Sequence, residues 1–117
     1  MNAIEPYVAL LWAAAAFNLV IGVAGLLGKG ASREGRIVCL LVLCFGIVYA
    51  LVALDPDRFA PVLWAGVPGK AGVIAIVLPA VARGELPKFI GWVLAGDALF
   101  AGFFLTLLLR MPVPPLA

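Results

Sequence analysis

Four polar side chains lie inside long apolar stretches of this 117-residue sequence, and they are the residues best suited to do chemistry. Lys70 lies in "WAGVPGKAGVI" and Asp97 in "VLAGDALFAG", while Asn18 and Tyr49 lie in two earlier apolar runs. A lysine and an aspartate can form an ion pair, exchange a proton or hold a polar ligand, and an amide or a phenol can add hydrogen bonds. These four residues are the predicted polar site.

The composition places this site in a lipid bilayer. The chain is 66% hydrophobic and 12% charged, with a mean hydropathy of +1.21. A soluble domain is about half apolar and about a quarter charged. A small globule this apolar would lack the polar side chains to cover its surface. The expected surroundings are therefore lipid. The net charge of +2 is too small to favour nucleic acid as a partner.

Four segments are long and apolar enough to cross the hydrocarbon core, which takes roughly 20 helical residues. They are residues 6–27, 36–54, 59–82 and 87–110. The tail, residues 111–117, contains three prolines and is expected to be extended. The predicted fold is therefore all-α and integral to the membrane. We expect one domain over residues 1–117, a four-transmembrane-helix bundle with up-down topology.

The third span contains Pro61, Pro68 and Pro79. A helix starting after Pro68 would be too short to cross the bilayer, so the span is expected to begin near Phe59. Proline inside a helix removes a backbone hydrogen bond and tends to kink it, which membranes tolerate when neighbouring groups compensate. We predict a kink near Pro68.

Lysine and arginine near the span ends predict the orientation, because cytoplasmic loops carry the excess of positive charge. The five cations expected inside are Lys29, Arg33, Arg36, Arg83 and Lys88, against Arg58 and Arg110 outside. Both termini are therefore expected outside the cytoplasm.

The first span is expected to be a retained helix and not a secretory signal, because Glu5 precedes it and no basic residue does.

Lys70 and Asp97 are expected at similar depths near the middle of the bilayer. Lys70 lies ~20 Å of helix rise from Arg83, and Asp97 lies ~15 Å from Pro87. The short turn "RGELP" makes the last two spans antiparallel neighbours. An unpaired charge at a helix centre costs ~2.5–3.5 kcal/mol on insertion scales, so the sequence predicts an ion pair.

Asn18 is expected nearly level with Asp97, on a face of the first span that also carries small residues. Ala14, Asn18, Gly22 and Gly25 share this face, and such faces let membrane helices pack closely. Tyr49 can add a hydroxyl to the same interior. Two interpretations stay open for the lysine and aspartate, namely a pair that only fixes helix register and a site for a ligand or proton. A third places Lys70 at the membrane interface.

No motif for a metal, a cofactor or covalent catalysis is found. The chain has no histidine, and Cys39 and Cys44 lie ~140° apart around one helix, so they are expected to be small apolar side chains. "GVAGLLGKG" follows a membrane span and has no Ser or Thr after its lysine, so it is not a phosphate loop. We expect no cofactor, no metal and no enzymatic activity.

Several segments together resemble a group of small, uncharacterised bacterial proteins with four transmembrane helices. These segments are "FNLVIGVAGLL", "GIVYALVALDPDR", "WAGVPGKAGVI" and "GDALFAGFFLTLL". The resemblance implies a multi-pass protein of the bacterial cytoplasmic membrane, and it implies no activity. The topology is also similar to that of DoxX-type proteins. Small multidrug transporters share this size and helix count, but they carry a glutamate within the first span. This chain has Asn18 there, so we do not assign it to that family.

Two classes of function remain. The first is a non-catalytic membrane component that self-associates or docks on a larger membrane complex. The second is a small binding or transport protein, in which Lys70, Asp97 and Asn18 hold a proton, an anion or a lipid or other small polar ligand.

Overall fold

The computed structural model describes residues 5–111, and these residues form helices and short connections without a strand. The helices are α1 (Glu5–Leu27), α2 (Arg33–Leu54), α3 (Pro56–Phe59), α4 (Leu63–Ala82) and α5 (Lys88–Arg110), with a 3₁₀ turn η1 (Ala60–Val62) between α3 and α4. Four stretches are long and apolar enough to cross a membrane: α1, α2, Pro56–Ala82 and α5. The predicted all-α class with four helices of membrane length is confirmed.

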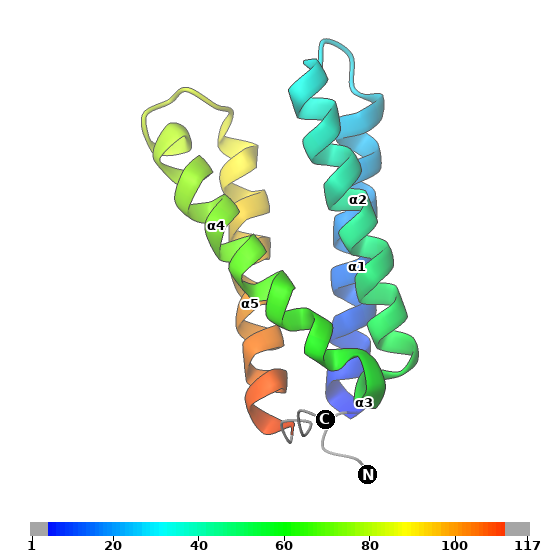
Figure 1. Cartoon of the computed structure of the whole chain (residues 1–117). Coiled ribbons are helices and arrows are strands. Elements are labelled where there is room, and N and C mark those ends of the chain that lie inside the picture. The colour runs from blue at the N-terminus through cyan, green and yellow to red at the C-terminus, as the bar shows by residue number, and fades with distance from the viewer. Residues whose placement is uncertain (1–4, 112–117) are drawn as a thin grey trace. The chain divides into compact units, whose positions relative to one another are not determined.

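The chain divides into two compact units, Met1–Ala60 and Pro61–Ala117, where the sequence predicted one domain. In the first unit α1 and α2 lie side by side, and in the second α4 and α5 do (Figure 1). We call these the first hairpin and the second hairpin. The boundary between the units falls within η1, so it interrupts the third predicted span.

Each hairpin turns at a glycine with a left-handed backbone. Gly30 has φ of 78° and Gly84 has φ of 76°, a region where an L side chain is strained. At the end of α4 the Gly84 N–H donates to the Val81 carbonyl and the Glu85 N–H donates to the Ala80 carbonyl. This is the Schellman arrangement, which ends a helix and reverses the chain within a few residues.

α2 begins at Arg33, three residues before the predicted start of the second span. The Ser32 side chain accepts a hydrogen bond from the Gly35 N–H at 3.0 Å. Such an N-cap satisfies one of the backbone donors that a helix leaves unpaired at its start. The signal was present in the sequence as a serine before the charged pair Arg33 and Glu34, but the glycines around it favoured a longer loop.

The third span contains α4 and the 3₁₀ turn that precedes it. α4 is continuously α-helical through Pro68 and Pro79, although proline has no N–H to donate. The change from α to 3₁₀ geometry lies earlier, at Ala60–Val62, which includes Pro61. The kink near Pro68 stays a prediction. The predicted extended tail lies outside the described residues from position 112 onward.

Large apolar side chains point outward on every long helix. Leu27, Leu41, Ile76 and Trp92 are examples that are more than half exposed. A water-soluble protein rarely exposes contiguous apolar surface on this scale, whereas hydrocarbon is a good solvent for it. The exposed pattern therefore agrees with the lipid environment that the composition predicts.

Candidate functional site

The Lys70–Asp97 ion pair joins the two helices of the second hairpin. The Lys70 Nζ atom donates to Asp97 Oδ1 at 2.6 Å, within the range of a strong charge-assisted hydrogen bond. Lys70 is 6% exposed and the Asp97 side chain is 15% exposed. The predicted ion pair is confirmed, and the alternative in which Lys70 reaches the membrane interface is not what the structure shows.

The antiparallel geometry of the hairpin explains why the two groups meet. Lys70 lies twelve residues before the end of α4, and Asp97 lies nine residues after the start of α5. At 1.5 Å per residue these positions differ by roughly 4–5 Å along the hairpin, which the four-carbon lysine stem can span. The turn at Gly84 fixes this alignment, because a longer connection would let one helix slide along the other.

Phe100 of α5 also lies near the Lys70 ammonium group. The Lys70 Nζ atom lies 6.0 Å from the centroid of the Phe100 ring. A cation over an aromatic face at this distance gains about 0.5–2 kcal/mol, with the larger values away from water. The sequence analysis missed this residue. The signal was its position three residues after Asp97, because residues three apart share a helix face.

Asn18 forms a polar contact between the two helices of the first hairpin. Its Nδ2 atom donates to the Val42 carbonyl at 3.1 Å, so the amide bridges α1 and α2. Asn18 is 5% exposed, and the neighbouring Ala14 on the same face is fully buried. The interpretation of Asn18 as a helix-packing residue agrees with this bond.

The predicted small-residue face of α1 packs closely, and its partner is the backbone of α2. A methyl group built on Gly22 would lie 2.7 Å from the Leu43 nitrogen and 2.8 Å from the Cys39 oxygen. From the other side, one built on Gly46 would lie 3.1 Å from the Ala15 oxygen. These gaps are too small for a side chain, so glycine is what allows the two backbones to approach.

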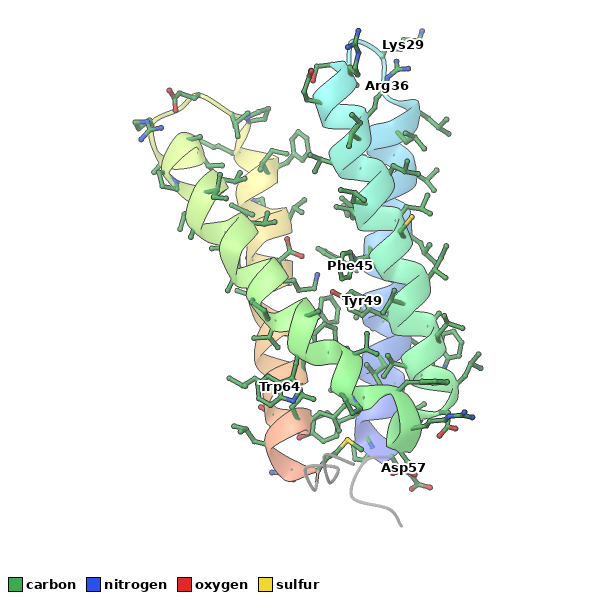
Figure 2. All side chains as sticks on the ribbon, in the orientation of Figure 1. Lys29, Arg36, Phe45, Tyr49, Asp57 and Trp64 are labelled. Carbon is green, nitrogen blue, oxygen red and sulfur yellow. The ribbon has the colours of Figure 1, made fainter. Side chains whose placement is uncertain are left out.

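Tyr49 is 2% exposed and lies beside Phe45 on the same helix, with ring centroids 6.1 Å apart (Figure 2). Tyr49 and Asn18 belong to the first hairpin, and the ion pair belongs to the second. Of the four predicted site residues, Lys70 and Asp97 are in direct contact.

Other chemistry is sparse among the described residues. Cys39 and Cys44 are both free thiols. No group of three His, Cys, Asp or Glu side chains in residues 5–111 is arranged to hold a metal ion. A second ion pair joins Arg83 to Glu85 at 2.9 Å, but both side chains are more than half exposed at the turn between α4 and α5.

Comparison with known proteins adds no family. No protein-family model matches this chain, and neither a curated protein nor a solved structure matches it.

Proposed function

We propose that this chain is a non-catalytic integral membrane protein, an accessory or self-associating component in which the Lys70–Asp97 pair fixes the register of α4 and α5. The observation that carries the proposal is the 2.6 Å contact between the two ions within a single hairpin. Among the described residues, every buried side-chain nitrogen or oxygen also has a hydrogen-bond partner. The polar side chains of a buried ligand site would instead have unsatisfied donors or acceptors when no ligand is bound.

The second hairpin also presents small residues that support docking of another membrane helix. A methyl group built on Gly69, Gly72 or Gly102 would meet no atom of its own hairpin within 4 Å. Small residues on a membrane helix allow a neighbour to approach closely, which is how helices associate where lipid removes the hydrophobic drive. A second copy or a larger complex would supply that neighbour.

The proposed location is the bacterial cytoplasmic membrane, with both termini outside. The orientation rests on Lys and Arg in the two hairpin turns and at the start of the helices after them. The bacterial assignment rests on the resemblance of the four quoted segments to small bacterial four-helix proteins.

The second candidate function is the binding or transport of a proton or a small polar ligand at the same pair. Asp97 engages Lys70 through Oδ1, and its side chain keeps 15% exposure. Its Oδ2 atom has no hydrogen-bond partner within residues 5–111, so it is able to accept one from a ligand. This free oxygen is the observation that favours the second candidate.

A double substitution separates the two functions. Lys70→Met with Asp97→Leu removes both charges and keeps the volumes similar, so no orphan ion is left. We expect the variant to fold, to keep the oligomeric state of the native chain in lipid nanodiscs, and to match it in proton flux when reconstituted into liposomes.

The matched control is Arg83→Gln with Glu85→Gln, which removes the exposed ion pair of the same hairpin. A proton or anion flux that is present in the native chain and in this control, but lost in the folded Lys70→Met and Asp97→Leu variant, would establish the second function and overturn the first.

A further inference from the structure

The turn of the first hairpin contains a recess of about 430 Å³ that combines cationic and apolar walls. It is lined by Leu26, Ala31, Arg33, Arg36, Ile37 and Leu40. All six residues belong to the first unit, so the recess is a property of one hairpin. The lining comes from the last turn of α1, the connection, and the first two turns of α2.

The four lining residues of α2 lie on one helix face, with the arginines first and the apolar residues further along the helix axis. Arg33, Arg36, Ile37 and Leu40 have the spacing i, i+3, i+4 and i+7, which places them above one another on the same side. The arginines lie at the helix start and the apolar pair lies about one turn further into the span. A charged group with an attached hydrocarbon chain matches this order, because its head meets the guanidinium groups and its tail follows the apolar wall.

Neither arginine is neutralised within the described part of the chain. The ion pairs there involve Lys70, Asp97, Arg83 and Glu85, and no side-chain hydrogen bond is made by Arg33 or Arg36. Both side chains are exposed. Lys29 lies at the same end of this hairpin and adds a third cation, against the single carboxylate of Glu34 (Figure 2).

The backbone donors of the first turn of α2 are not what makes this site. Ser32 already accepts from the Gly35 N–H, so the binding groups are the two guanidinium forks. Guanidinium forks recognise phosphate oxygens through paired, charge-assisted hydrogen bonds. The membrane span that begins here places these arginines at the level of the lipid headgroups.

We infer that this recess is a binding site for the phosphate headgroup of an anionic phospholipid, with the first part of an acyl chain lying over Ile37 and Leu40. The site is independent of the Lys70–Asp97 pair, since all its residues lie in the other unit. Loss of the site would therefore leave the register of α4 and α5 unchanged.

The test compares two pairs of turn cations in the full-length protein. Delipidated protein in neutral detergent is titrated with phosphatidylglycerol or phosphatidylcholine, and the bound lipid is counted by native mass spectrometry. We expect phosphatidylglycerol to bind in preference. Arg33→Gln with Arg36→Gln is expected to weaken that binding roughly thirtyfold, since each interfacial cation contributes a severalfold factor.

The matched control is Arg83→Gln with Lys88→Gln, which removes the same charge from the turn of the second hairpin, where Arg83 is already paired with Glu85. It is expected to change the affinity less than threefold. Equal losses in both variants would mean general attraction between cations and anionic lipid, and would overturn the inference.

Two further arms address folding and the source of the phosphate. Arg33→Lys with Arg36→Lys keeps the charge and loses the forks, so an intermediate affinity is expected, and circular dichroism checks that each variant keeps its helices. Soluble glycerophosphoglycerol or inorganic phosphate in millimolar excess is expected not to displace the lipid, because neither has an acyl chain. Displacement by either compound would make the recess a site for a soluble phosphate and contradict the lipid assignment.

Discussion

The two hairpins hold their helices together by different means. In the first, glycines bring the backbones of α1 and α2 into direct contact, and one amide of Asn18 bonds across to Val42. In the second, a methyl group added at Gly91 would lie 3.5 Å from a Val81 methyl, an ordinary contact distance, and an ion pair makes a polar link. Burial of apolar surface does not drive helices together in lipid, so close contact and polar bonds must do it.

This difference between backbone contact and an ion pair predicts which substitutions each hairpin tolerates. The contacts of the first hairpin depend on the absence of side chains, so added volume should harm it most. The second hairpin depends on two opposite charges, so it should tolerate added volume at Gly69, Gly72 and Gly102 and should not tolerate the loss of one charge.

The largest expected effect comes from removing one partner of the ion pair. Lys70→Met or Asp97→Leu alone leaves an unpaired charge within the span, and each is expected to lower the free energy of unfolding by about 3–5 kcal/mol. The double variant is expected to be close to the native chain. Unfolding is followed by steric trapping or by denaturant titration in bicelles.

Removal of the exposed Arg83–Glu85 pair in the same hairpin controls for charge loss as such, and is expected to change stability by less than about 1 kcal/mol. Single variants as stable as the double variant would show that the pair does not hold the second hairpin together.

The next effect is overpacking of the first hairpin. Gly22→Ala places a methyl group against the Leu43 nitrogen, the Cys39 oxygen and the Leu43 Cβ atom, none of which can rotate away. We expect a loss of about 1–3 kcal/mol. The matched control is Gly72→Ala, where the added methyl meets no atom of its own hairpin. A change within about 0.5 kcal/mol is expected there. Equal losses at both glycines would remove the distinction between the hairpins.

A smaller effect is expected at Gly25, because its neighbour is a side chain. A methyl group there would overlap the Sγ atom of Cys39, which can move to another rotamer. Gly25→Ala is therefore expected to cost less than Gly22→Ala, and Cys39→Ala in the same chain should restore part of the loss. A double-mutant cycle measures this coupling, which is expected to be about 0.5 kcal/mol or more. Additive effects would contradict the contact.

The smallest effect concerns the amide bond between α1 and α2. Asn18→Leu removes the donor to the Val42 carbonyl, which still has its own helical partner. Hydrogen bonds between membrane helices contribute about 0.6 kcal/mol on average and rarely more than about 1.7 kcal/mol. A loss in this range is expected from unfolding in bicelles. A loss as large as that of a single ion-pair variant would mean that Asn18 has a role beyond this bond.

The sequence predicted the helices and the Lys70–Asp97 ion pair, where the free-energy cost of the alternatives is high. A lysine and an aspartate in neighbouring apolar spans are costly to leave unpaired. Their ion pair could be predicted because the two residues lie at similar depths and a short turn joins their helices. The small-residue face of α1 followed from spacing alone. Phe100 was not predictable in the same way, because it is one of seven phenylalanines and residue type does not distinguish it.

The remaining differences concern backbone detail. At the early start of α2, the Ser32 side chain accepts from the Gly35 N–H and the Ser32 carbonyl accepts from the Arg36 N–H, and the nearby glycines obscured this cap in the sequence. The 3₁₀ turn at Ala60–Val62 and the unit boundary within it were not predicted, because the uninterrupted run of apolar residues did not distinguish this position.

The most direct test of the central claim measures the Lys70–Asp97 contact in a bilayer. Solid-state NMR on protein in lipid vesicles, with ¹⁵Nζ-labelled lysine and ¹³Cγ-labelled aspartate, detects the dipolar coupling between the two groups. We expect a strong coupling consistent with the 2.6 Å contact between Nζ and Oδ1, and its loss in Lys70→Met. Absence of that coupling, with the Lys70 ammonium protons exchanging freely with water, would contradict the account.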